Sequence, residues 1–218
     1  MLANLEWVEP IQPRPWSSRR NYRILKRVMD FGMSAILLPF AVVLGAVIAL
    51  AIWVNSPGPA LYVQYRTGRG GQRFRMLKFR TMVSNAEQLK ANYAHLNVLS
   101  WPDFKLAQDP RVTKVGQFLR RTSLDELPQL INVLRGEMSL VGPRPTSFEA
   151  GTYSLWHTQR LEVLPGITGL WQVSGRADLD FNRRVELDIA YLERQSLGLD
   201  IQILFRTVSA VFSGRGAY

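Results

Sequence analysis

Two adjacent carboxylates, Asp125 and Glu126, are the side chains of this sequence best placed to do chemistry. They lie in the stretch RRTSLDELPQLINVL, residues 120–134, after two arginines and before a leucine-rich pattern. The 218 residues include no cysteine and only two histidines, His95 and His157. Thiolate chemistry and cysteine zinc sites are therefore excluded, and the acids have to carry any acid–base or metal chemistry. Mg²⁺ is the metal that carboxylate oxygens favour.

The local pattern around this acid pair predicts the start of a helix. Apolar residues recur at helical spacing at Leu124, Leu127, Leu130, Ile131 and Leu134. This spacing directs neither acid into the core. Ser123 and Glu126 fit a capping box, whereas Asp125 as N-cap would place Pro128 at a permitted position, so both starts remain open.

A helix start also suits chemistry on phosphate. It attracts anions, and Arg120 and Arg121 add positive charge. We therefore expect Asp125 to stay ionised at neutral pH, and an ionised aspartate can accept a phosphoryl group. On local spacing alone, the favoured interpretation of the pair is still a helix cap.

A long apolar segment precedes this stretch. Residues 31–54 contain no charged side chain and are long enough to cross a membrane. Pro39 lies inside the segment and predicts a bend. Arginines and lysines flank both ends, and such flanks favour the cytoplasm. A spanning helix, and a re-entrant helix that bends at Pro39 and returns to the same face, both remain open.

The rest of the chain is predicted to be a mixture of helix, hairpin and loop. Leu61–Arg66 and Phe74–Thr81 are β-rich runs on either side of the sequence GRGG, which we interpret as an ordinary hairpin turn and not a phosphate-binding loop. Other predicted elements are a polar helix at Ser84–Leu99, a loop at 165–176, and amphipathic helices at Arg183–Gln195 and Leu199–Phe212. The last of these suits either the core or a membrane surface.

The net charge of +10 predicts an anionic partner: nucleic acid, a phosphate-bearing ligand or an acidic membrane surface. One function that would satisfy this charge is a non-enzymatic, membrane-anchored basic scaffold that binds acidic lipid or nucleic acid. Such a scaffold would have no use for the acid pair beyond capping a helix.

Several motifs, taken in order, resemble the bacterial sugar transferase family, the monotopic polyprenyl-phosphate phosphoglycosyl transferases. They are KRVMDF, SPGPALYVQYRTGRGGQRFRMLKFRTM, DPRVTKVGQFLRRTSLDELPQLINVLRGEMSLVGPRP, PGITGLWQVSGR and ELDIAYLERQSLGLDIQIL. The resemblance implies transfer of a sugar-1-phosphate, here a hexose-1-phosphate, from a UDP-sugar to undecaprenyl phosphate with release of UMP. That reaction initiates exopolysaccharide, capsule or O-antigen assembly. It implies no nucleic-acid partner and leaves a homo-oligomer open.

The same resemblance assigns roles to individual residues. Asp125 is implied to be the nucleophile that forms a covalent aspartyl-phosphosugar with Mg²⁺ bound beside it. Glu126 is implied to support the metal or the acceptor phosphate. The basic residues implied to contact the phosphates or nucleotide of the donor are Arg120, Arg144, Arg176, Lys78 and Arg80.

The implied fold is α+β and mainly helical, in three parts. Residues 1–20 form an irregular N-terminal arm. Residues 21–54 form a re-entrant membrane helix, broken near Pro39, with both ends cytoplasmic. Residues 55–218 form a cytosolic catalytic domain with a small β-hairpin and amphipathic interface helices. We therefore expect the chain at the cytoplasmic face of a bacterial inner membrane, in contact with its lipids.

Overall fold

The structure is a computed structural model that describes residues 16–97, 106, 108–152, 154–174 and 179–212. Its α-helices and strands are α1 (Trp16–Asn55), β1 (Leu61–Thr67), β2 (Arg73–Phe79), α2 (Lys114–Thr122), α3 (Gln129–Arg135), β3 (Ser139–Val141), α4 (Leu155–Thr158), β4 (Gly166–Thr168), α5 (Leu170–Ser174), α6 (Phe181–Arg194) and α7 (Leu197–Phe212). Short 3₁₀ segments are η1 (Arg69–Gly71), η2 (Gln88–Leu96), η3 (Leu124–Glu126), η4 (Ala150–Thr152) and η5 (Gln159–Glu162). The predicted α+β, mainly helical fold is confirmed.

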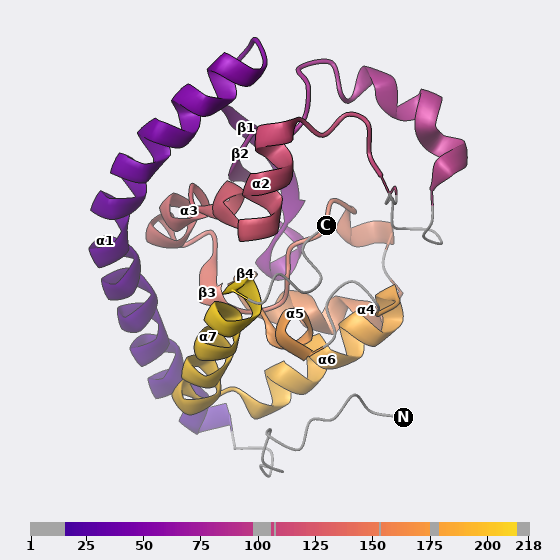
Figure 1. Cartoon of the computed structure of the whole chain (residues 1–218). Coiled ribbons are helices and arrows are strands. Elements are labelled where there is room, and N and C mark those ends of the chain that lie inside the picture. Colours follow the sequence, from indigo (N-terminus) through magenta and orange to yellow (C-terminus); the bar gives the residue numbers. More distant parts are fainter. Residues whose placement is uncertain (1–15, 98–105, 107, 153, 175–178, 213–218) are drawn as a thin grey trace.

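The long helix α1 curves along the outside of the molecule and contacts α2, α3, β3 and α7 (Figure 1). It is the one helix of the described chain that is long and apolar enough to cross a membrane, and only 17% of its most apolar 18-residue stretch is buried. Phe40, Val43 and Val54 are among its exposed side chains. So large an apolar surface is unfavourable in water and suits lipid.

The predicted break at Pro39 is not an interruption of the helix, because α1 is continuous from Trp16 to Asn55 with Pro39 inside it. A proline removes its own backbone hydrogen bond, but the bonds on either side can keep the chain helical through a bend. Residues 16–20, which we expected to be irregular, are helical as well. The rest of the predicted arm, residues 1–15, lies outside the described residues.

Buried polar contacts attach the first half of α1 to the rest of the chain. Arg27 donates hydrogen bonds to the carbonyl oxygens of Val133 (2.6 Å) and Leu134 (2.9 Å), near the end of α3. Cations stabilise these carbonyls at a helix C-terminus. Asp30 accepts hydrogen bonds from the Ser139 hydroxyl (2.7 Å) and the Leu140 N–H (3.1 Å) of β3.

A second set of contacts converges on Asp200 at the start of α7. Its fully buried carboxylate accepts hydrogen bonds from the hydroxyls of Tyr22 (2.8 Å) and Tyr191 (2.7 Å), and from Lys26 (3.0 Å). We call these contacts, together with those of Arg27 and Asp30, the α1 attachment. Because breaking a buried charged hydrogen bond is costly, the attachment makes α1 part of the same packed body as β3, α3 and α7.

Strands β1 and β2 form the predicted antiparallel hairpin, joined by η1. Gly70 of the turn has φ of 66°, a conformation that favours glycine. Because side chains alternate across a strand, the register divides the hairpin into two faces. One face carries Tyr62, Gln64 and Arg66 of β1 and Phe74, Met76 and Lys78 of β2.

A parallel pairing of β3 with β4 and the short helix α5 were not predicted. The expectation of a loop over residues 165–176 is therefore wrong as far as Ser174. The strands are only three residues long, too short to show a period of two. Their glycines permit a close approach, since a Cβ on Gly166 would lie 2.1 Å from the backbone nitrogen of Gly142.

The predicted polar helix at Ser84–Leu99 is also corrected. Its described part is turn followed by the 3₁₀ segment η2, and its last two residues lie outside the described chain. Most positions from 84 to 97 are polar residues or alanine, which leaves little apolar surface to stabilise a full α-helix by packing.

The two amphipathic helices near the C-terminus are confirmed as α6 and α7. Tyr191 of α6 and Leu199 and Ile203 of α7 lie in the main core. Another part of α7 exposes Phe205 and Val208. The helix therefore packs on the core and still presents apolar side chains outward. The two predicted roles of this helix, packing on the core and lying on a membrane surface, are compatible.

Candidate active site

The acid pair, Asp125 and Glu126, lies in η3, between the end of α2 and the start of α3. Ser123 adopts a left-handed conformation (φ 57°) that ends α2, and its side chain makes no capping hydrogen bond. The predicted capping box is therefore wrong. Asp125 is not an N-cap either, because α3 begins only after Pro128. Pro128 suits a helix start, where its missing N–H has no intrahelical partner to lose.

Both acids are mostly buried, contrary to the expectation that neither is directed inward. The side chains of Asp125 and Glu126 are only 12% and 13% exposed. The expectation assumed one uninterrupted helix over residues 124–134, whereas η3 and α3 are separate elements and η3 packs against β2.

Glu126 is held between two cations. The Nζ of Lys78 lies 2.8 Å from Glu126 Oε1. The guanidinium of Arg144 reaches both carboxylate oxygens, Oε1 through Nη2 and Oε2 through Nη1 at 3.2 Å. Burial alone would raise the pKa of Glu126, but Arg144 and Lys78 outweigh it and hold this pKa well below its usual range. Glu126 is therefore ionised at neutral pH, and it positions both cations.

Asp125 has a different environment. Its closest cation is Lys78, with Nζ 3.8 Å from Oδ2, and its carboxylate accepts no hydrogen bond from the described residues. Burial raises the pKa of Asp125, and Glu126 adds to this rise while Lys78, Arg144 and Arg120 oppose it. We expected positive charge to dominate here, but the loss of solvent is the larger effect. The two neighbouring carboxyls thus have pKa values shifted in opposite directions.

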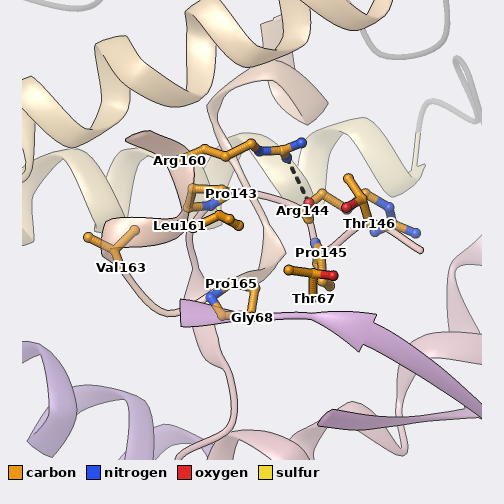
Figure 2. Close-up of a pocket in the computed structure, with 10 residues that line it drawn as sticks. All are labelled: Thr67, Gly68, Pro143, Arg144, Pro145, Thr146, Arg160, Leu161, Val163 and Pro165. Atoms are coloured by element: carbon orange, nitrogen blue, oxygen red, sulfur yellow. Dashed lines mark hydrogen bonds between the residues drawn. The ribbon is translucent and has the colours of Figure 1, made fainter. Parts of the chain in front are cut away.

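The main chain of Arg144 is held in place by Arg160 of η5. The Nη2 of Arg160 donates a 2.7 Å hydrogen bond to the carbonyl oxygen of Arg144, at the edge of a small pocket lined by residues that include Thr67 and Pro165 (Figure 2). The same nitrogen lies 2.6 Å from Oδ2 of Asp188 on α6, and both side chains of this ion pair are almost fully buried. Asp188 and Arg160 therefore support the segment that presents Arg144 to Glu126.

The structure brings four of the predicted residues into direct contact: Asp125, Glu126, Lys78 and Arg144. Arg120 lies beside them, where it interacts electrostatically with Asp125 and donates a 3.0 Å hydrogen bond from Nε to the Thr81 hydroxyl.

Arg80, another of the predicted basic residues, is not part of this cluster. Arg80 hydrogen-bonds the carbonyl oxygens of Ser56 (2.7 Å) and Pro57 (2.6 Å) at the end of α1. The alternation of β2 ends at Phe79, so Arg80 does not follow Lys78 to the same face. Arg176 lies outside the described residues, and its predicted role stays a prediction.

Sequence reasoning missed Arg66, which lies on the same hairpin face as Lys78. Its guanidinium is close enough to Arg144 and Glu126 for both charges to affect its pKa. The predicted hairpin contained a usable signal, since pairing its two strands in register would have placed Arg66 and Lys78 on one face.

The charges of this cluster are not balanced. Among the described residues, the four cations Lys78, Arg144, Arg120 and Arg66 surround Asp125 and Glu126, while a third acid, Asp109, interacts with Arg120 but is paired with Arg111. An excess of cations around a partly buried site attracts anions, and arginine is well suited to phosphate. A carboxylate that accepts no hydrogen bond and lies beside cations able to hold a phosphate is suited to phosphoryl transfer.

Comparison with known proteins identifies the family of the chain that carries this site. The bacterial sugar transferase family matches residues 21–214 of the chain. The chain therefore belongs to the bacterial sugar transferase family.

Individual relatives include enzymes named for sugar-phosphate transfer. The undecaprenyl-phosphate galactose phosphotransferase of Salmonella typhimurium is 44% identical, over 92% of this chain and 43% of that protein. The UDP-glucose:undecaprenyl-phosphate glucose-1-phosphate transferase of Escherichia coli is 40% identical, over 97% of this chain and 45% of that protein. The chain thus spans less than half the length of these two relatives. It covers 91% of the exopolysaccharide production protein ExoY of Sinorhizobium fredii, which is 39% identical over 95% of this chain.

Proposed function

We propose that this chain is a phosphoglycosyl transferase that transfers a hexose-1-phosphate from a UDP-sugar to undecaprenyl phosphate and releases UMP. The step would initiate exopolysaccharide, capsule or O-antigen assembly. The observation that carries the proposal is the buried acid pair, in which Glu126 is bound to two cations while Asp125 accepts no hydrogen bond within the described chain. The names of the relatives support the substrate classes. A basic scaffold without chemistry gives this acid pair no role.

In the proposed first step, an Oδ atom of Asp125 attacks the phosphorus atom that carries the sugar. A bond forms between Asp125 and that phosphorus, and the bond to the oxygen of UMP breaks, so UMP leaves with the electron pair. In the second step a phosphate oxygen of undecaprenyl phosphate attacks the same phosphorus atom and displaces Asp125. The product is undecaprenyl-diphospho-hexose, and the carboxylate is restored for the next cycle.

The surrounding residues stabilise charge in both steps. Lys78 and Arg144, positioned by Glu126, lie where negative charge develops on the phosphate oxygens. Arg120 adds positive charge on the Asp125 side of the cluster. Because the raised pKa of Asp125 means that protonation competes with attack, the rate should increase as pH rises through that pKa.

Mg²⁺ would fit this site as an ion that the protein and the substrate coordinate together. Among the described residues no group of three or more His, Cys, Asp or Glu side chains could hold a metal ion, so the ion would depend on phosphate oxygens and water for most of its ligands, as Mg²⁺ commonly does. Asp125 would be the protein ligand, since its carboxylate has no hydrogen-bond donor among the described residues. When bound, the ion would neutralise charge on the diphosphate.

The proposed location is the cytoplasmic face of the bacterial inner membrane, with α1 re-entrant. The exposed apolar surface of α1 and the outward Phe205 and Val208 of α7 support contact with lipid. Cysteine labels introduced singly as Leu2→Cys and Pro110→Cys test this topology, because the natural chain has no cysteine. Both labels should react from the same side in oriented vesicles, and labelling from opposite sides would rule out the re-entrant arrangement.

The activity is tested with the full chain in lipid nanodiscs, supplied with Mg²⁺, undecaprenyl phosphate and a panel of UDP-sugars. UMP release from at least one hexose donor is expected, and chelation of Mg²⁺ should stop it. Asp125→Asn should abolish UMP release, while Asp180→Asn, which changes an acid at the start of α6, should leave it near normal. Without acceptor, the wild type should release about one UMP per chain and gain the mass of a phosphohexose. No UMP from any donor would count against the proposal, and normal activity of Asp125→Asn would exclude this nucleophile.

A further inference from the structure

The face of the hairpin that carries Lys78 also carries a second cation, Arg66. In the β1–β2 register Arg66 is paired with Phe74 and Tyr62 with Lys78, so alternation places all four side chains on one face. Lys78 reaches Glu126 from this face. Arg66 therefore approaches the acid pair from the same side, further along the hairpin.

Arg66 is a partly buried arginine without a matching anion. Its Nη2 donates to the neutral amide oxygen of Gln64 at 2.5 Å, and its buried Nε has no hydrogen-bond partner among the described residues. Burial, followed by the nearby charge of Arg144, lowers its pKa to about 10, so it still carries a charge at neutral pH. A cation whose buried donor has no partner is unfavourable unless something pairs with it.

Glu126 does not neutralise this charge. It already accepts hydrogen bonds from Lys78 and from both Nη atoms of Arg144. The Thr67 N–H donates a 2.9 Å hydrogen bond to the carbonyl oxygen of Thr146, so the segments that carry Arg66 and Arg144 lie side by side, and the charge of Arg144 contributes to the lowered pKa of Arg66. Such a pair is stabilised when a group with two or more negative oxygens lies between the guanidinium planes.

We propose that Arg66 and Arg144 together bind one phosphate group, beside Glu126 and on the hairpin side of the acid pair. The inference deepens the proposed function and rests on it for the source of the phosphate. The phosphate group could belong to the diphosphate of the nucleotide donor or to the lipid acceptor, since both present negatively charged phosphate oxygens to the two arginines. Arg66 is then a binding residue that the phosphate itself holds in place.

Two probes distinguish these sources, each measured by isothermal titration with the full chain in nanodiscs of uncharged lipid. UDP represents the donor, and farnesyl phosphate added to the nanodiscs represents the acceptor. Arg66→Gln removes the charge, and Arg66→Lys retains the charge but not the planar donor geometry. Arg75→Gln is the matched control, because Arg75 carries the same charge on the opposite face of the same hairpin and is exposed.

Arg66→Gln should weaken binding of at least one probe by about tenfold to a hundredfold, the loss expected for a charge-assisted contact. Arg66→Lys should fall in between, and Arg75→Gln should stay within about twofold of the wild type. Weakened UDP binding would assign the site to the donor, and weakened farnesyl phosphate binding would assign it to the acceptor. Thermal unfolding in the same nanodiscs shows whether each variant is folded. If Arg66→Gln does not fold, the loss of affinity of Arg66→Lys tests the proposal instead.

The proposal is overturned if Arg66→Gln binds both probes as tightly as the wild type, if Arg75→Gln loses as much affinity, or if the wild type binds neither probe. These outcomes are separate from a failure of the proposed function. Arg66-dependent binding in a chain that releases no UMP would keep the site and reject the reaction. UMP release together with Arg66-independent binding would reject the site alone.

Discussion

Asp188 allows a quantitative prediction, because its carboxylate is 1% exposed and, among the described residues, forms an ion pair with Arg160 alone. Burial raises its pKa from 3.8 to about 6, against the opposing charges of Arg160 and Arg184. At about 1.4 kcal/mol for each tenfold change in proton affinity, this rise corresponds to roughly 3 kcal/mol of stability. Between pH 4 and 6 the folded chain binds this proton more tightly than the unfolded chain. The contribution of Asp188 to the free energy of unfolding therefore falls as pH rises through this range.

Thermal unfolding of the full chain in nanodiscs, followed by the fluorescence of its six tryptophans, measures this effect. On lowering the pH from 7 to 4, the melting temperature of the wild type should rise relative to that of Asp188→Asn. For a chain of this size about 3 kcal/mol corresponds to roughly 6–12 °C. Taking the difference in melting temperature between the two proteins removes the contribution of the other carboxyl groups, which both proteins share.

Asp109→Asn is a control of opposite sign. Hydrogen bonds from Arg111 lower the pKa of Asp109, so its contribution to stability is complete above its unfolded pKa, near 4. The difference between wild type and Asp109→Asn should therefore be constant from pH 7 to 5 and shrink only in stronger acid. A constant difference between wild type and Asp188→Asn over pH 4 to 7 would refute the reasoning about Asp188.

Three further predictions concern positioning and packing. Arg160→Gln should slow UMP release about tenfold in the wild type, because Arg160 acts through the main chain of Arg144. In an Arg144→Ala background the same substitution should slow UMP release less than twofold. Equal losses in both backgrounds would indicate a general structural role. Asn132→Leu should lower the free energy of unfolding by about 2–4 kcal/mol, because two main-chain groups of β2 lose their buried partner, and a change in melting temperature of under 2 °C would contradict this. Gly116→Ala should destabilise by about 1–3 kcal/mol or more, because its Cβ would lie 1.9 Å from a backbone oxygen. Gly198→Ala, with nothing within 4 Å, should be neutral or slightly stabilising in the same assay.

Elements with a local signal could be predicted from the sequence. The apolar run of α1 is recognised by its length without a charged residue, and the hairpin and the helices α6 and α7 by the period of their apolar side chains; all four occur near the predicted positions. The strands β3 and β4 could not be predicted in this way. Each is three residues long, and they exist because distant segments pair through glycines that allow close contact.

The sequence suggested individual side chains of the candidate site but not their arrangement. Lys78, Glu126 and Arg144 come from separate segments, and only the resemblance to a family suggested that they act together. The burial of Asp125 was missed because the leucine pattern predicted one continuous helix, although Pro128 indicated a second start. Arg80 was named only through the resemblance, and its side chain hydrogen-bonds the carbonyl oxygens of Ser56 and Pro57. The error on Asp125 came from continuing a local pattern across a point where tertiary packing ends it.

The α1 attachment has a consequence for how the membrane would affect the reaction. Arg27, Asp30 and Asp200 join the helix that would enter the lipid to the body that carries the acid pair. If this body moves as a unit, any change in the tilt of α1, caused by a thicker bilayer or different lipid packing, would alter the height of Asp125 above the headgroups. Turnover would then depend on bilayer thickness, even when donor, acceptor and metal concentrations are unchanged.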